Sequence, residues 1–339
     1  MKKTMKKTVC FGEIMARMCP PDGIRIGQSS VLEMTFGGAE SNVAASLACL
    51  GLPSSYVTKL PDNPLTDACI AQLRALNVDT SSIAIGGERM GIYFVEKAIS
   101  FRPSRVVYDR KHSSIACIRP GDIDWDSAFE GANWFHWSGI TPALSPEAAQ
   151  EQLAACRIAK ARGLTVSCDL NYRPALWSGE EASRVMTPLM EYTDVVIANE
   201  SEPGIVFDLH ADKKYYEDGA LSSEGYAVLA KAICDRFDIK KCGFAIREGT
   251  QKGLYIWSGL VYDCASGKYE VSSKYNLQIM DRIGGGDAFS AGLIAAMQYG
   301  QNDKDAVCFA AAASALKHTF QGDINRATKA EVDALLGRK

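Results

Sequence analysis

Short apolar runs alternate with longer helical patterns through the second half of the chain. The apolar runs cover residues 134–137, 164–170 and 195–198, and the helical patterns cover residues 146–162 and 180–192. Apolar runs of this length between helices are typical of parallel strands that are buried on both faces of a sheet. The pattern therefore predicts an α/β fold in which helices cover both faces of a mainly parallel central sheet.

The first third of the chain has a different pattern, because several strand signals follow one another without a long helix between them. Residues 14–36 contain two such signals. In residues 91–97, Ile92 and Phe94 alternate with Tyr93 and Val95, and residues 105–110 give a further strand signal. Alternation with a period of two predicts strands that have one buried face. This pattern predicts the strands, but it does not by itself place them relative to the main sheet.

The composition limits the classes of function. The chain has 339 residues, of which 47% are hydrophobic and 23% are charged, and its formal net charge is −3. These values predict a globular protein with either one α/β domain that carries a smaller inserted element or two domains. Positive and negative residues are interspersed, so no basic stripe indicates a nucleic acid or a membrane as partner. We therefore expect small-molecule ligands.

We expect no export signal at the Lys-rich start of the chain, because Glu13 and Arg17 interrupt the segment that would have to be apolar. No run approaches the roughly 18 apolar residues of a membrane helix. Eleven cysteines are spread from Cys10 to Cys308 without a Cys-x-x-Cys pair, and the four histidines are scattered. We expect a cytoplasmic protein whose cysteines are mostly reduced and buried, with no zinc site.

The segment of residues 281–289 (DRIGGGDAF) carries the strongest chemical signal. Three glycines stop at Asp287, and an apolar helical run follows at once. Glycines let backbone N–H groups converge, and the start of a helix adds exposed donors and the positive end of its dipole, which together favour phosphate. Asp287 at the edge of such a cradle could take the proton of an attacking hydroxyl. In isolation, the same letters would fit an ordinary loop with Asp287 as a helix N-cap.

A second pair of glycines lies in residues 37–42 (GGAESN), between a strand signal and a helical pattern at residues 43–50. A tight turn explains this pair when it is taken alone. Together with residues 281–289, the segment resembles the two signatures of the PfkB sugar kinases, which have the ribokinase fold. The departures are Arg282, where the family usually has Thr, and Gly285, where it usually has Ala.

The resemblance implies a single PfkB carbohydrate kinase domain over residues 5–339, with a ribokinase-like three-layer α/β/α fold. In this family, strands such as those in residues 14–36 and 88–118 form a small β-sheet lid over the sugar, which is often also a dimer surface. Family members use ATP and Mg²⁺. The resemblance leaves a monovalent cation open as a further cofactor, and it leaves open a homodimer or a higher homo-oligomer through the lid.

The family motifs also imply roles for individual residues. Asp287 would be the general base of phosphoryl transfer. The backbone amides beside it would stabilise charge on the transferring group, and they belong to Gly284, Gly285 and Gly286. The first motif would bind the hydroxyl groups of the sugar through Gly37, Gly38 and Asn42.

Two further motifs concern the metal and the nucleotide. Asn199 and Glu202 match an Asn-x-x-Glu motif in which the Glu positions Mg²⁺ through water, although a polar helix start explains the same letters. Arg247, Gly249 and Gly253 occupy the place of the nucleotide-binding loop. A β-hairpin turn fits these three residues too, and the two interpretations are compatible because ATP can rest on such a turn.

The remaining arginines and tyrosines bear on the substrate. A neutral sugar needs hydroxyl partners, whereas a sugar acid also needs a cation, and the planar arginine fork fits a carboxylate. Four residues are candidates for substrate contacts: Tyr93, Tyr108, Arg110 and Arg173. The sequence around them resembles 2-keto-3-deoxygluconate kinases more closely than ribokinases or adenosine kinases. Asp109 is a departure from that resemblance. The alternative for each arginine is a surface salt bridge.

The resemblance thus implies phosphorylation of 2-keto-3-deoxygluconate to its 6-phosphate. Two alternatives stay open at this point. One is a fructokinase or another neutral-sugar kinase of the same family, and the other is a non-catalytic nucleotide or sugar sensor on the same fold. In relatives the region that contains Asp323 closes the nucleotide site, and we expect His318 to be structural.

Overall fold

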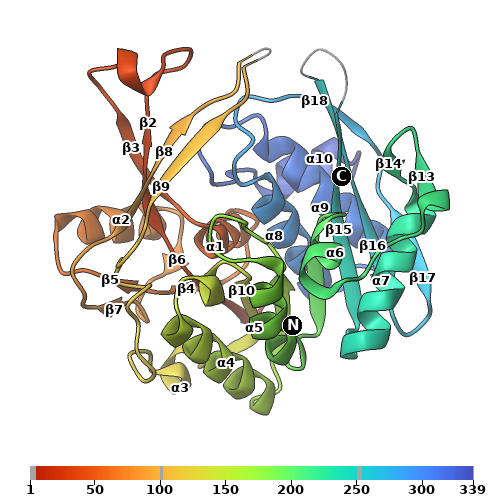
Figure 1. Ribbon diagram of the computed structural model, residues 1–339, viewed down its shortest axis with the longest axis horizontal. Coiled ribbons are helices and arrows are strands. Elements are labelled where there is room, and N and C mark those ends of the chain that lie inside the picture. The colour runs from red at the N-terminus through yellow and green to blue at the C-terminus, as the bar shows by residue number, and fades with distance from the viewer. Residues whose placement is uncertain (1–4, 100–101, 250–253, 339) are drawn as a thin grey trace.

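The computed structural model describes residues 5–99, 102–249 and 254–338, and a large twisted sheet runs through its centre (Figure 1). Within these residues the sheet has ten strands. Their order is β17 (Lys268–Val271), β16 (Leu254–Asp263), β15 (Lys241–Gly249), β12 (Val195–Ala198), β11 (Thr165–Asp169), β10 (Ala132–Ser138), β1 (Lys7–Phe11), β4 (Ser54–Val57) and β6 (Val78–Asp79), with β18 (Tyr275–Gln278) paired to β16.

The sheet is parallel from β6 to β15, and the antiparallel part is confined to the edge formed by β16, β17 and β18. The main-sheet strands expected at residues 134–137, 164–170 and 195–198 are all present. The prediction of a mainly parallel central sheet is therefore confirmed.

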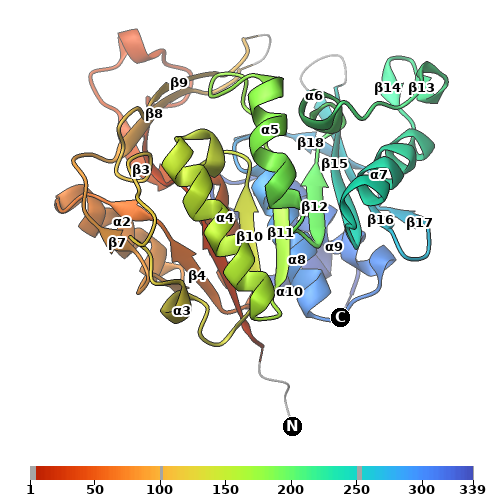
Figure 2. The same ribbon diagram turned by 60° about the horizontal axis from the view of Figure 1, so that its bottom comes forward.

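Helices cover both faces of this sheet (Figure 2). Each face has its own hydrophobic core. One core contains side chains of α3 (Trp125–Ala128), α4 (Pro146–Ala161), α5 (Gly179–Met190), α6 (Glu202–Phe207) and α7 (Ser223–Phe237). The other contains side chains of α1 (Ala39–Cys49), α2 (Pro64–Ala75), α8 (Gly285–Gln298), α9 (Asp303–Lys317) and α10 (Lys329–Leu335). Consecutive residues of β12 alternate between the two cores, as the pleat of a buried strand requires. The three-layer α/β/α prediction is confirmed.

Capping residues fix where the predicted helices begin. The side chain of Ser145 accepts a hydrogen bond from the amide of Ala148, and Pro146 occupies the first turn of α4. Ser178 and Glu181 form a reciprocal capping box at the start of α5. Both arrangements satisfy N–H groups that have no partner within the helix.

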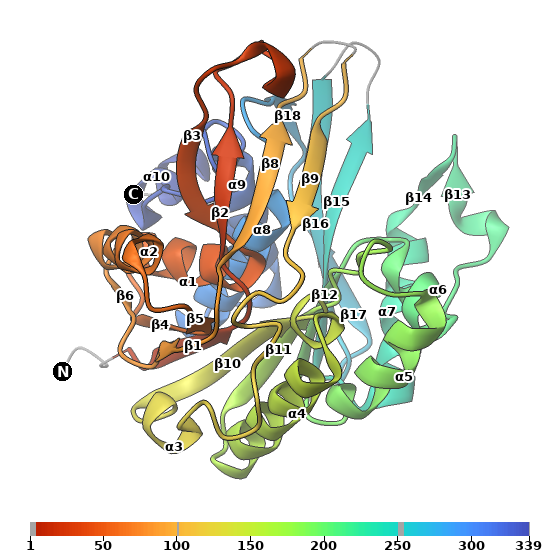
Figure 3. The ribbon, with the colours of Figure 1, turned by 60° about the vertical axis from the view of Figure 1, so that its left-hand side comes forward.

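A second, four-stranded sheet stands beside the main one (Figure 3). Its order is β3 (Glu33–Gly37), β2 (Met15–Cys19), β8 (Gly91–Glu96) and β9 (Arg105–Asp109). The β2–β8 pair is parallel and the other two pairs are antiparallel. We call these four strands the small sheet; they come from the two segments in which consecutive strands were expected.

The remaining short elements are β5 (Lys59–Leu60), β7 (Ala84–Ile85), β13 (Tyr216–Glu217), β14 (Ala220–Leu221), and the 3-10 turns η1 (Ile26–Gln28), η2 (Thr141–Ala143) and η3 (Lys213–Tyr215). In the part of the chain that the structure describes, no helix combines the length and the apolar character needed to cross a membrane.

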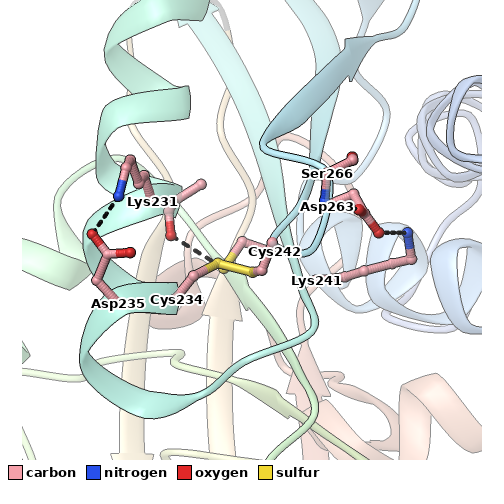
Figure 4. Close-up of a disulfide and its surroundings, with 9 residues drawn as sticks. Lys231, Cys234, Asp235, Lys241, Cys242, Asp263 and Ser266 are labelled. Atoms are coloured by element: carbon pink, nitrogen blue, oxygen red, sulfur yellow. Dashed lines mark hydrogen bonds and ion pairs between the residues drawn. A yellow bond between two sulfur atoms is a disulfide. The ribbon is translucent and has the colours of Figure 1, made fainter.

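Most cysteines are free thiols, as expected, but Cys234 and Cys264 form a disulfide (Figure 4). Cys234 lies near the end of α7, and Cys264 directly follows β16. They are 30 residues apart, and their Cα atoms lie 5.9 Å from each other, within the usual range for a disulfide. The free thiol of Cys242 on β15 lies 3.8 Å from the sulfur of Cys234. No local sequence motif predicts this disulfide, because its two cysteines lie in different elements that only the fold brings together, the end of α7 and the turn after β16.

Candidate functional site

A cavity of about 580 Å³ lies between the small sheet, the carboxyl ends of β11 and β12, and the start of α8. Ligands of open α/β sheets bind beyond the carboxyl ends of their strands, so this is the expected place for a site. The residues singled out from the sequence that line it are Gly37, Gly38, Asn42, Tyr93, Tyr108, Arg110, Arg173, Asn199, Glu202, Arg247, Gly284, Gly285, Gly286 and Asp287. Gly249 is not among the lining residues, and Gly253 lies outside the described residues.

The start of α8 forms the glycine-lined part of the cavity. Gly284 caps the helix with φ of 82°, a left-handed conformation that favours glycine. A Cβ at Gly284 would also overlap the main-chain oxygen of Asp323. A Cβ at Gly286, by contrast, would meet nothing within 4 Å. Gly286 therefore leaves open space above the first turn of the helix, where an anion could reach the free N–H groups.

Asp287 lies in the first turn of α8, and its carboxylate is half-buried. Its Oδ2 atom accepts a hydrogen bond of 2.7 Å from the side-chain amide of Asn42. Burial raises the pKa of Asp287 to about 6, although the Asn42 hydrogen bond and the charges of Arg173 and Lys317 oppose this increase. A carboxylate with such a pKa is mostly ionised at neutral pH and can accept a proton.

The paired glycines join the small sheet to α1. Gly38 is the N-cap of α1, and a Cβ on it would overlap the main-chain oxygen of Glu13. A Cβ on Gly37 would lie 2.6 Å from a carboxylate oxygen of Asp323. These close approaches explain why both positions are glycine. They also bring Asn42, one turn into α1, to the edge of the cavity.

Arg110 is already paired. Its Nη2 atom lies 2.5 Å from the Oε2 atom of Glu13, and its guanidinium lies 4.8 Å from the centre of the Tyr108 ring. Burial raises the pKa of Glu13, while the Arg110 charge opposes that increase. Arg110 therefore forms a salt bridge, as the alternative interpretation expected, but the pair is buried at the cavity wall and does not lie on the surface.

Arg173 is the second cationic candidate, and it follows β11 in an exposed position at the cavity. It forms no ion pair with another residue in the described part of the chain. Burial raises the pKa of Asp169, Glu202 and Asp287, and the charge of Arg173 opposes this increase. Arg173 is thus able to accept an anionic ligand without first breaking a contact.

Two carboxylates occupy the middle of the cavity wall. Glu202 accepts hydrogen bonds from the amides of Asn199, at 2.9 Å, and Tyr172, at 3.1 Å. Asp169 ends β11, and burial together with the charges of Glu202 and Asp287 raises its pKa well above the usual value. Oxygen donors in such a position suit the water shell of Mg²⁺. The sequence interpretation missed Asp169, although its place at the end of a predicted buried strand was a usable signal.

A buried ionic group beneath the small sheet was also missed. Arg17 on β2 donates to Asp281, with the two atoms 2.5 Å apart, and to Asp323. The hydroxyl group of Tyr93 on β8 also donates to Asp323. These contacts tie the small sheet to the segment before α8, and Asp323 belongs to the part of the cavity under that sheet.

The other end of the cavity has an aromatic wall. Trp257 packs against His318, with 4.7 Å between the ring centres. The hydroxyl group of Tyr226 donates to Glu200 at 2.9 Å. Arg247 lines the same cavity, and its guanidinium lies 5.8 Å from the centre of the Tyr255 ring. His318 is buried. Its ring nitrogen Nδ1 is hydrogen-bonded to the main-chain oxygen of Ser314, and its ring packs against Trp257, as expected of a structural residue.

Comparison with known proteins finds relatives of similar sequence and fold. A solved structure of 2-dehydro-3-deoxygluconokinase from Thermotoga maritima has a TM-score of 0.93 and 44% sequence identity, with 98% of both chains covered. The 2-dehydro-3-deoxygalactonokinase of Haloferax volcanii is 32% identical over 328 residues, which cover 97% of this chain and 96% of that protein. An E. coli protein assigned to ribokinase II, solved with ATP and Mg²⁺, shares the fold with a TM-score of 0.77 at 19% identity and covers 98% of this chain and 100% of that one. A model described as pfkB family carbohydrate kinase matches residues 5–330, and the chain therefore belongs to the pfkB family of carbohydrate kinases.

Proposed function

We propose that the protein transfers the γ-phosphoryl group of ATP to the 6-hydroxyl of 2-keto-3-deoxygluconate, with Asp287 as general base. The observation that carries this proposal is the hydrogen bond between Asn42 and Asp287 beside the glycine-lined helix start. It joins a hydroxyl-binding amide, a proton acceptor with a pKa of about 6 and an anion-binding helix end at one point of a single cavity. This combination suits phosphoryl transfer to an alcohol.

The substrate assignment rests on the cations around the sugar end. Arg173 has no ion-pair partner among the described residues and offers its guanidinium to a carboxylate, and Arg110 can share its charge between Glu13 and the substrate. Tyr93 and Tyr108 stack with 5.9 Å between their ring centres and form a wall against which the carbon chain would pack. The Thermotoga maritima and Haloferax volcanii relatives are named for closely related keto-deoxy sugar acids, which supports the same substrate class here.

In the proposed reaction, Asn42 and Asp287 hold the acceptor hydroxyl, and Asp287 takes its proton as the oxygen attacks the γ-phosphorus atom of ATP. The bond from this phosphorus to the bridging oxygen breaks at the same time, and ADP leaves with that oxygen. The amides of Gly284 to Asp287 stabilise negative charge on the transferring group. Glu202 and Asp169 would hold Mg²⁺ through its water ligands, and this ion supplies positive charge next to the phosphates. Arg247 and Trp257 would contact the nucleotide, together with Asn199.

A neutral sugar is the second candidate, because Glu13 already neutralises Arg110. A fructokinase would use the same base and the same glycines, and would need only hydroxyl partners. The decisive difference is whether Arg173 contributes to acceptor binding.

The test is the release of ADP from the purified protein with Mg-ATP and a panel of acceptors. The panel contains 2-keto-3-deoxygluconate, its 4-epimer 2-keto-3-deoxygalactonate, gluconate, fructose, ribose and adenosine. Preference for either keto-deoxy acid supports the proposed substrate class, and preference for fructose supports the neutral-sugar alternative. If no acceptor causes ADP release although ATP still binds, the result would support the sensor interpretation.

We also propose that the protein works in the cytoplasm, where ATP is supplied. There it would form a homodimer through the small sheet. Large apolar side chains are exposed on its strands or next to them, with 60% of Val31, 44% of Met34 and 45% of Val107 accessible. Exposed apolar patches of this kind mark protein interfaces. Light scattering after size exclusion tests the dimer, and a monomer that persists at high protein concentration would refute it.

A further inference from the structure

Lys317 is a fully buried lysine to which the proposed reaction assigns no role. It is the last residue of α9, and none of its surface is accessible. Its Nζ atom donates a hydrogen bond of 2.9 Å to the main-chain oxygen of Asp281. Lysine is almost never fully buried unless its charge is compensated, so an ammonium ion at this point requires negative charge nearby.

The surroundings of Lys317 are rich in negative charge. Burial lowers its pKa to about 8, whereas Asp281, Asp323 and Asp287 raise it and Arg17 lowers it further. The side chain is therefore mostly protonated at neutral pH. An ammonium group has three donors, and Asp281 provides its one hydrogen-bond acceptor among the residues that the structure describes.

The end of α9 holds the segment that carries the glycines. The hydroxyl group of Ser314 donates to the main-chain oxygen of Gly285 at 2.6 Å, and the main-chain oxygen of His318 accepts from the amide of Met280 at 2.9 Å. Together with the hydrogen bond from Lys317 to Asp281, three contacts from the end of α9 hold residues 280–285 in place. This segment leads directly into Asp287, so its position sets the position of the base.

We propose that Lys317 is a positioning residue, whose ammonium group fixes the segment before α8 through the main-chain oxygen of Asp281 and supplies a resident positive charge there. The consequence is that phosphoryl transfer by this protein needs no free monovalent cation. Preorganised charge of this kind requires no rearrangement when the transferring group develops its own charge. The inference rests on the proposed function for its activity measurement, but the binding measurement below does not.

The first experiment compares initial rates of the full-length wild-type protein in buffers that contain only tetramethylammonium, Na⁺, K⁺ or NH₄⁺ as monovalent cation. We expect rates that agree within about twofold, because Lys317 already provides the charge. Stimulation of roughly tenfold or more by K⁺ or NH₄⁺ would overturn the proposal. This comparison needs no variant, so it remains decisive if a substitution prevents folding.

The second experiment uses Lys317→Met, which keeps the length of the side chain and removes the charge. We expect kcat to fall at least about tenfold in tetramethylammonium buffer and to recover in part with NH₄⁺ or K⁺, which can enter the vacated position. The matched control is Lys304→Met on the same helix, because Lys304 also donates to a main-chain oxygen, that of Val271, but is exposed. A purely structural role would give no recovery with cations, and that result would overturn the proposal.

A binding measurement separates this inference from the sugar assignment. Calorimetry with a non-hydrolysable ATP analogue and Mg²⁺ needs no sugar at all. We expect weaker binding to Lys317→Met than to the wild type, and recovery with NH₄⁺ but not with tetramethylammonium. If no sugar is phosphorylated but this pattern is seen, the proposed reaction fails while the role of Lys317 stands. Equal affinity of both proteins in all buffers would refute it.

Discussion

The side-chain nitrogen of Asn42 lies 2.7 Å from the Oδ2 atom of Asp287, although 245 residues separate the two in the chain. The contact joins the two glycine segments at a single hydrogen bond. A donor next to a carboxylate favours its ionised form, so Asn42 opposes the increase in pKa that burial causes. The same contact also fixes the direction in which Asp287 faces the cavity.

Asp287→Asn should leave the fold intact and remove most of the activity. Asparagine keeps an oxygen that can accept the hydrogen bond from Asn42, but it cannot take a proton. We expect kcat to fall by roughly 10² to 10⁴-fold. Steady-state kinetics and a melting curve measure the two effects. A folded variant with nearly wild-type turnover would exclude Asp287 as the base.

The rate should depend on pH through the same carboxylate. Because ionised Asp287 is the active form and its pKa is about 6, kcat/KM should fall about tenfold per pH unit below that value. Asn42→Ala removes a contact that lowers this pKa, so its acidic limb should move to higher pH. The comparison concerns the apparent pKa of the acidic limb and not the maximum rate. If this pKa is the same in the variant and the wild type, the titration of Asp287 does not cause the limb.

Arg173→Ala should weaken the binding of a sugar acid and leave the binding of a neutral sugar nearly unchanged. A charged hydrogen bond contributes about 1.5 to 3 kcal/mol, which corresponds to an increase in KM of roughly 10 to 100-fold for the acid. Arg184→Ala, an exposed arginine on α5, is the matched control. Equal effects of Arg173→Ala on an acid and on fructose would contradict the carboxylate role.

Two glycines of the cradle should respond differently to alanine. Gly284→Ala meets both a left-handed backbone and the main-chain oxygen of Asp323, so it should lower stability by at least about 1 to 3 kcal/mol. Gly286→Ala meets no neighbour within 4 Å, so it should fold normally and lose nucleotide affinity, because its methyl group enters the anion site. Melting curves and titration with ATP distinguish the two. Equal stability losses would be inconsistent with this geometry.

The Cys234–Cys264 pair should contribute to stability under oxidising conditions. A disulfide that closes a loop of this length typically contributes about 2 to 4 kcal/mol. Cys264→Ser should therefore lower the melting temperature without reductant, and reductant should lower that of the wild type. Cys117→Ser, at an exposed free thiol, is the control. Mass spectrometry of non-reduced peptides identifies the bond, and free thiols at both positions would contradict it.

The hydrophobic pattern was sufficient for most of the sheet and helices, but it misplaced the start of α1. The expected helix covered residues 43–50, whereas α1 begins at Ala39, because Gly38 is its N-cap. The first turn is polar yet buried. Glu40 there accepts hydrogen bonds from Ser138, at 2.6 Å, and from Thr141, at 2.9 Å, which compensate its burial. Such compensation depends on distant strands, so the local pattern could not indicate it.

The same limit applies to the site. Glycines and Asp287 stand together in the sequence, so their spacing was informative. Arg17 and Lys317, however, acquire their partners only when the small sheet and α9 meet the segment around Asp281. In the sequence each is one charged residue among many, and only the folded chain distinguishes them from solvated surface residues.

The place of α8 and α9 at the end of the chain has a consequence for synthesis on the ribosome. Both helices share one core with α1, which emerges much earlier. Until residues 285–317 have left the exit tunnel, the apolar face of the N-terminal half stays uncovered and is a target for chaperones. The base arrives with the helices that close this core. A nascent chain therefore gains its protective cover and its proton acceptor in the same late step of translation.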